Sequence, residues 1–268
     1  MQRLGILDFF GVITNFTSKT LTIAELEARK LHHDSTEILT RAVQPALWLL
    51  IFGEVLASVK AIPTGNIPYI DFMAPGILAQ SVLFIAIFYG IAIIWERDLG
   101  IVHKFLASPT PRAALVLGKA LSAGERGLAQ AAIVYALAFC LGVHLNWNPI
   151  SLLLVVVVVI LGASLFSTFS LIIACLVKTR DRFMGIGQIL TMPLFFASNA
   201  IYPISIMPKW LQIISQINPL TYETDALRAL MLTNGPTVYG VPFDLLFLVA
   251  ATAVNVAIGA KLYPRVVT

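Results

Sequence analysis

Long apolar stretches alternate with short polar segments along the 268-residue chain. A transmembrane helix needs about 20 predominantly apolar residues. Six stretches approach or exceed this length, and together they fill most of the sequence. The pattern therefore predicts an all-α integral membrane protein with six transmembrane helices, at residues 43–62, 72–94, 114–142, 150–177, 184–204 and 241–263.

The third stretch differs from the others because charge interrupts its first half. Lys119, Glu125 and Arg126 lie there, and the continuous apolar part begins near Leu128. The sequence leaves open whether residues 114–127 belong to the span or approach it along the membrane interface.

Composition and charge support a membrane location. Hydrophobic residues make up 58% of the chain and charged residues 12%, against roughly 25% charged in soluble domains. The isoelectric point is basic, near 9.1, but the Lys and Arg residues are scattered singly beside the predicted spans, which argues against a nucleic-acid partner. With the N-terminus inside, 15 of the 18 basic residues fall on the cytoplasmic side. Since basic loops stay in the cytoplasm, we expect a multi-pass protein of the inner (plasma) membrane with both termini cytoplasmic.

Residues 20–42 mix apolar and charged positions in a pattern typical of an amphipathic helix on the cytoplasmic membrane surface. The alternative is a solvated N-terminal extension. In either case the chain divides into a cytoplasmic N-terminal segment at 1–42 and a transmembrane domain at 43–268.

A second irregular region, 205–235, is too polar to span a membrane. It contains two short helical patterns, 208–217 and 220–232, separated by Asn218-Pro219. Proline suits the first turn of a helix, and Asn218 or Thr221 can cap it. We therefore predict re-entrant helices on the outer side, packed against protein because irregular backbone at membrane depth requires it.

Few ionisable residues lie inside the predicted spans. Glu54 is the one acid well within a span, and a charge there costs about 2.5–3.5 kcal/mol. Glu54 is predicted to face protein or water as a cavity or gate residue, or else to lie near the outer interface. Asp71, at the start of the second span, is predicted to be interfacial. Asp225 and Arg228 are three residues apart, so they share a helix face and are predicted to form a buried pair, the alternative being a weak ion pair on a solvated helix.

Enzyme chemistry finds no support in the sequence. The four histidines have no nearby nucleophile, and the two cysteines lack metal-ligand spacing. Gly118-Lys119 is not a phosphate loop, because Ala113 and Ala120 stand where that motif needs glycine and Ser or Thr. We expect no catalytic residue, no metal and no cofactor in this chain, and ATP bound by a separate chain if ATP drives it.

Residues 95–121 form the most distinctive polar segment. Trp95 suits the membrane interface, and Gly100 permits a break after the charged turn. Val102, Phe105 and Leu106 share one face of a short helix that the following prolines end. Such a helix is suited to inserting into a cleft on a partner, and the alternative is an ordinary surface loop.

Four segments carry a resemblance to a known family. They are FMAPG at 72–76, ERDLGIVHKFLASPTPR at 96–112, LGK at 117–119 and NPLTYETDALR at 218–228. Their order and spacing resemble the membrane subunits of type-2 ABC exporters, the permeases paired with daunorubicin-resistance, nodulation-factor and polysaccharide ATPases. The chain departs from the family pattern at Ile101, where threonine is common, and at Pro111, which is unusual.

The resemblance implies a half-transporter that forms a homo- or heterodimer and binds two cytosolic ATPase subunits, which carry ATP and Mg. It also implies a coupling helix at about 97–107. The ATPase-coupling residues would be Glu96, Arg97, Gly100, Lys104, Phe105 and Pro109. The substrate path or gate would involve Glu54, Phe195, Phe196, Asn199 and Tyr202, although plain packing also explains these aromatic residues. The outer re-entrant helices would contain Asn218, Pro219, Tyr222, Asp225 and Arg228.

The expected function is export of a hydrophobic or amphiphilic substrate, a drug or a lipid-like molecule, from the cytoplasm or inner leaflet by a non-catalytic subunit in contact with membrane lipids. The alternatives are a polysaccharide or lipo-oligosaccharide exporter, or a membrane enzyme or scaffold outside the ABC class.

Overall fold

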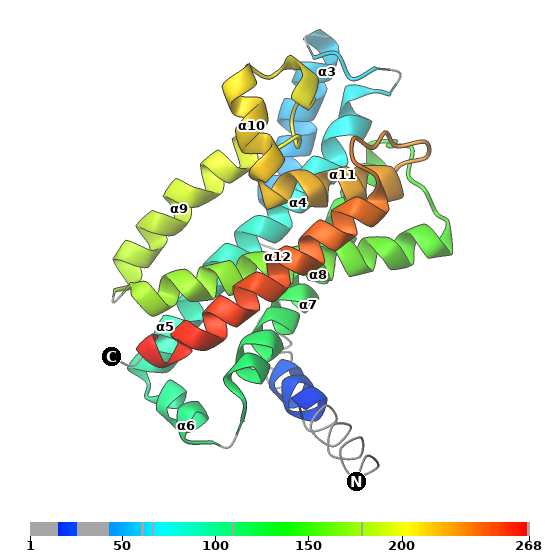
Figure 1. Ribbon diagram of the computed structural model, residues 1–268. Coiled ribbons are helices and arrows are strands. Elements are labelled where there is room, and N and C mark those ends of the chain that lie inside the picture. The colour runs from blue at the N-terminus through cyan, green and yellow to red at the C-terminus, as the bar shows by residue number, and fades with distance from the viewer. Residues whose placement is uncertain are drawn as a thin grey trace.

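The computed structural model describes residues 16–25, 43–59, 62–65, 67–108, 110–177 and 179–266. Within these ranges the chain is helical and contains no β-strand, only an isolated antiparallel bridge between Leu145 and Leu232. The all-α prediction is thus confirmed for the described residues (Figure 1).

A helix occupies each of the six predicted apolar stretches. The first runs over Val43–Val59 and contains a π-helical segment, η1 (Trp48–Gly53), before α3 (Glu54–Val59). The remaining helices in these stretches are α4 (Tyr69–Tyr89), α5 (Ile91–Asp98), α7 (Arg112–Cys140), α8 (Pro149–Leu176), α9 (Arg180–Phe196) and α12 (Val241–Leu262). The shorter elements between or after them are α6 (Ile101–Ala107), η2 (Ile204–Ile206), α10 (Lys209–Ile217), α11 (Pro219–Met231) and η3 (Tyr263–Val266).

Three of these helices are long and apolar enough to cross a membrane: Tyr69–Asp98, which bends at Gly90, Pro149–Leu176 and Val241–Leu262. The chain is therefore an integral membrane protein. The helix over Val43–Val59 is apolar but shorter.

The charged first half of α7 does not form a separate interfacial approach. α7 is one continuous helix of 29 residues, in which Lys119 is buried and Arg126 stacks on the ring of Tyr89, 4.5 Å away. Because these side chains find partners inside the protein, they do not interrupt the helix.

The hydrophobic core lies around α4 and α8. α4 is buried along nearly its whole length, and α7, α8 and α11 pack against it. Close approach depends on glycine at one crossing in particular: a Cβ added to Gly76 of α4 would lie 2.3 Å from the carbonyl oxygen of Ala200. This approach fixes the segment after α9 against the start of α4.

A second, smaller core lies at the end of the molecule that holds α5, α6 and η3 (Figure 1). Val102, Phe183 and Tyr263 are fully buried there, and Ile23 of the helical segment 16–25 packs beside Gly118 of α7. α10 lies at the opposite end of the molecule (Figure 1). Of the predicted interface helix at 20–42, residues 26–42 lie outside the described part.

Candidate functional site

The polar segment between α5 and α7 turns at Gly100. This residue has φ of 71°, a left-handed conformation that residues with a side chain rarely adopt. The turn separates α5 from α6, and the Ser108 hydroxyl ends α6 by donating to the Phe105 carbonyl at 2.7 Å. Gly100 therefore sets the direction in which α6 leaves the helix bundle.

α6 is amphipathic, as the sequence predicts. Val102 is fully buried and Phe105 and Leu106 are partly buried, whereas His103 and Lys104 are exposed. The exposed face therefore presents a histidine and a lysine at this end of the molecule. Pro109, which the sequence places among the coupling residues, lies outside the described residues.

Glu96 is buried and does not lie on that surface. The Lys119 ammonium donates to its carboxylate at 2.6 Å, and both side chains are less than a tenth exposed. This ion pair joins the end of α5 to the first half of α7. Glu96 can therefore influence α6 only through the position of α5, not by touching a partner.

Asp98 connects the same turn to α9. Its carboxylate pairs with Arg97 at 3.0 Å and with Arg180, at the start of α9, at 2.9 Å. The Arg180 guanidinium also lies 3.4 Å from the centre of the Trp95 ring. Two helices, α5 and α9, thus meet at this cluster.

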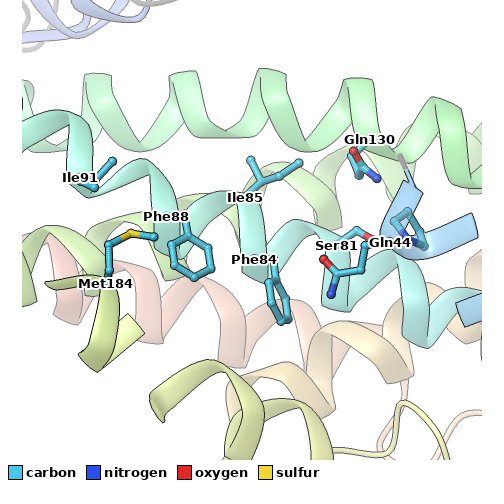
Figure 2. Close-up of a pocket in the computed structure, with 9 residues that line it drawn as sticks. Gln44, Ser81, Phe84, Ile85, Phe88, Ile91, Gln130 and Met184 are labelled. Carbon is cyan, nitrogen blue, oxygen red and sulfur yellow. The ribbon is translucent and has the colours of Figure 1, made fainter. Parts of the chain in front are cut away.

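A pocket of about 400 Å³ opens between five helices (Figure 2). The start of the first helix, α4, α5, α7 and α9 contribute its walls. The lining residues are Gln44, Pro45, Ser81, Phe84, Ile85, Phe88, Ile91, Gln130 and Met184.

The pocket is apolar at one end and polar but uncharged at the other. Phe84 and Phe88 lie one turn apart on α4 with ring centres 6.1 Å apart, and Met184 lies beside Phe88 (Figure 2). Gln44, Ser81 and Gln130 gather at the opposite end (Figure 2). Carboxamides and a hydroxyl donate and accept hydrogen bonds without charge. The pocket therefore suits a ligand with an apolar body and a neutral polar group.

None of the residues predicted for the substrate path lines this pocket. Phe195 is fully buried and packs edge-on against Trp48, with ring centres 5.5 Å apart. Asn199 is buried beside the start of α4, and Glu54 is exposed on the surface of the first helix. Phe196 and Tyr202 line a separate apolar groove of about 680 Å³ between α9 and α10.

The two helices after α9 begin and end close to the predicted positions. Asn218 caps α11 by accepting from the Leu220 amide at 3.0 Å, and Pro219 follows in the first turn. The Asn218 amide also donates to the Leu194 carbonyl at 2.7 Å, which ties α11 to α9. Tyr222 stacks on Phe247 of α12, with ring centres 3.9 Å apart.

The predicted pair between Asp225 and Arg228 is wrong, although both side chains are buried as expected. Arg228 donates to the backbone carbonyls of Phe72 at 3.2 Å and Asn199 at 2.7 Å. Asp225 accepts from the Thr237 hydroxyl and the Val238 amide, each at 2.8 Å. Sharing a helix face did not make them partners, because neighbouring segments offer better-placed groups.

Asp71 lies in the first turn of α4. Its side chain is buried, and one carboxylate oxygen lies 2.8 Å from Nδ1 of the exposed His144, in the loop after α7. This contact connects the start of α4 to that loop, and the interfacial position of Asp71 stays a prediction.

Comparison with known proteins places these features in a family. The family described as ABC-2 type transporter matches residues 19–232. The chain belongs to this family. The matched region includes α6, the pocket and α11, so all the sites described above lie inside it.

Several named relatives are similar over most of this permease. Over 84% of the chain and 77% of the relative, it is 29% identical to ycf38 of Cyanophora paradoxa, a protein named as a transport permease. It is 24% identical to the daunorubicin resistance ABC transporter permease DrrB1 of Streptomyces coeruleorubidus, over 80% of the chain and 75% of the relative. It is 25% identical to nodulation protein J of Rhizobium leguminosarum bv. trifolii, over 73% and 74%.

Sequence reasoning did not identify the pocket of this permease. Its polar residues come from three helices distant in sequence, so no local motif joins them. One signal was present: Gln130 is a carboxamide within the apolar half of α7, where a buried polar group needs a specific environment. The sequence shows Lys119 as a charge that interrupts an apolar stretch, but no local pattern predicts its ion pair with Glu96.

Proposed function

We propose that this chain is the permease half of an ATP-driven exporter that moves a hydrophobic or amphiphilic substrate, drug-like or lipid-like, out of the cytoplasm or inner leaflet. The observation that carries the proposal is the uncharged pocket, with aromatic residues at one end and carboxamides at the other. Family membership supports the class of transporter, and a relative named for daunorubicin resistance supports a drug-like substrate.

In this proposal all six helical stretches cross the membrane. α9 has 17 residues and is about 25 Å long at 1.5 Å per residue, so the segment after it completes the crossing. α10 and α11 are re-entrant helices on the outer side, where Asn218 and Pro219 set the turn between them. Residues 1–42 form a cytoplasmic segment with an interface helix, and residues 43–268 form the transmembrane domain.

The proposed complex has two permease subunits, homo- or heterodimeric, and two cytosolic ATPase subunits that bind ATP and Mg. α6 is the coupling helix. Its exposed residues, including Lys104, contact the ATPase, whereas Glu96, Gly100 and Phe105 position the helix and Arg97 fixes Asp98. Glu54 and the apolar groove that contains Phe196 and Tyr202 face the second permease subunit and the substrate path, since both are exposed on this chain.

The test is uptake into inside-out membrane vesicles that contain the permease and its ATPase. A neutral alkyl glycoside, an alkyltrimethylammonium and an alkyl phosphate of equal chain length serve as probes. We expect ATP-dependent uptake to favour the neutral probe. Phe84→Ala and Gln44→Leu should weaken uptake several-fold, whereas Phe139→Ala, at an exposed position outside the pocket, should not.

A polysaccharide or lipo-oligosaccharide exporter is the alternative. If none of the alkyl probes is transported and a lipid-linked oligosaccharide stimulates ATP hydrolysis, the amphiphile proposal fails and this alternative replaces it.

A further inference from the structure

Glu223 is a buried carboxyl group with no hydrogen-bond donor in the described part of the chain. It lies on α11, its exposed fraction is 0%, and neither carboxylate oxygen has a hydrogen-bond partner among the described residues. Its position is independent of the pocket and of α6.

The Glu223 carboxyl lies directly against the backbone of α8. A Cβ added to Gly162 would lie 2.2 Å from Oε1 and 2.6 Å from Oε2. Gly162 therefore leaves the space that the carboxyl fills. The backbone amides of a helix interior are already bonded within the helix, so this surface offers no donor to the carboxylate.

No cation lies against Glu223 from the surrounding helices. α11 packs against α4, α8 and α12. Three of the charged side chains on these helices bond elsewhere, and Asp244 of α12 is a second buried carboxyl group, which supplies no positive charge. Arg228 bonds to two backbone carbonyls, Asp225 to the Thr237–Val238 turn, and Asp71 lies against His144. The other titratable groups on these four helices are Tyr69, Asp71, Tyr89, Cys175, Tyr222, Asp225, Arg228, Asp244 and Lys261.

An ionised carboxylate in this environment is strongly unfavourable, because it has lost water and gained neither donor nor counter-ion. A bound metal cation would need several oxygen ligands. In the described part of the chain no three acidic, histidine or cysteine residues gather around a common point. A proton neutralises the group without further ligands.

We infer that Glu223 is a proton-binding site, which holds its proton while α11 packs on Gly162 and releases it when α11 moves away and water enters. Proton binding at this site would link the position of α11 to pH. The inference does not depend on the transported substrate or on an ATPase partner.

Infrared difference spectroscopy of the purified full chain in lipid nanodiscs tests the protonation state directly. At pH 7, Glu223→Gln should remove a carbonyl band of a neutral carboxylic acid. Asp98→Asn should not, because Asp98 is an exposed carboxylate paired with two arginines. A wild-type spectrum that shows no such band relative to Glu223→Gln overturns the inference.

A glycine pair provides the second test and does not require Glu223→Gln to fold. Gly162→Ala should displace the carboxyl and shift or abolish the neutral-acid band, whereas Gly185→Ala, whose Cβ would meet nothing within 4 Å, should leave it unchanged. Equal bands in the two variants would contradict the proposed position of the proton.

The pH dependence of thermal unfolding gives a third readout. The native chain keeps the proton and the unfolded chain loses it as pH rises, so the wild type should lose stability relative to Glu223→Gln between pH 5 and pH 9. A dependence on Na⁺ concentration at fixed pH, in place of pH, would show a cation site and overturn the proton assignment.

Discussion

Two buried charges at the junction of α5 and α7 satisfy each other, and the pair connects the membrane core to the polar turn. Removing one partner of such a pair leaves an uncompensated charge in the interior, which costs about 3–5 kcal/mol. Lys119→Met and Glu96→Met should therefore each lower the melting temperature strongly. The double variant should recover much of the loss, because it buries apolar side chains in place of both charges.

Thermal unfolding of the four proteins in the same detergent measures this coupling as a double-mutant cycle. Additive losses in the double variant would show that Glu96 and Lys119 act separately, and that other contacts hold the end of α5.

Arg228 stabilises the meeting of α4, α11 and the segment after α9. Its guanidinium reaches two carbonyls at once and stacks 3.8 Å from the centre of the Phe72 ring. Lysine cannot reproduce this forked geometry, so Arg228→Lys should destabilise the permease, and Arg228→Ala should do so further. Each carbonyl left without a donor costs about 1–3 kcal/mol. Arg182→Ala, at an exposed position on α9, is the control, and melting temperatures that match it would refute this role.

At the scale of elements, α6 separates structural from exposed residues on opposite faces. Val102 is buried, so its replacement would destabilise the fold, and a loss of activity could not be assigned to coupling. Lys104 is exposed and avoids this problem. Surface substitutions usually change stability by less than about 0.5 kcal/mol. Lys104→Glu should therefore leave the melting temperature unchanged while it reduces substrate-stimulated ATP hydrolysis several-fold.

Lys209→Glu makes the same charge change on α10, at the opposite end of the molecule, and should leave stimulation intact (Figure 1). Equal stimulation in the Lys104 and Lys209 variants would remove the exposed face of α6 from the coupling role.

Local pattern was sufficient to locate the helices and insufficient to choose their contacts. Apolar length predicted helices in six stretches, Gly100 predicted the turn, and Asn218 was one of two predicted caps. These features depend on residues close in sequence. Asp225 has donors in the Thr237–Val238 turn, and Asp71 has His144, because tertiary packing brings those groups near. The pocket was not predicted for the same reason, because tertiary packing brings its lining residues together from separate helices.

At the scale of the whole molecule, the proposed orientation in the membrane rests on the distribution of the basic residues. α6 and the C-terminal part of α12 lie at one end of the molecule, and α10 at the other (Figure 1). The positive-inside bias predicts that the α6 end faces the cytoplasm. This orientation requires the loop after α7 and the loop before α12 to face outward, since each is separated from α6 by an odd number of proposed crossings.

Cysteine labelling of intact cells with a membrane-impermeant maleimide tests this orientation. After Cys140 and Cys175 are replaced, single cysteines at the exposed positions Trp147 and Pro236 should react from outside. Cysteines in place of Lys104 and Asp181, which are equally exposed on the chain, should react only after the membrane is permeabilised. Reaction of Lys104→Cys in intact cells would contradict this orientation. The exposed face of α6 would then lie outside the cell, where no cytosolic ATPase could reach it.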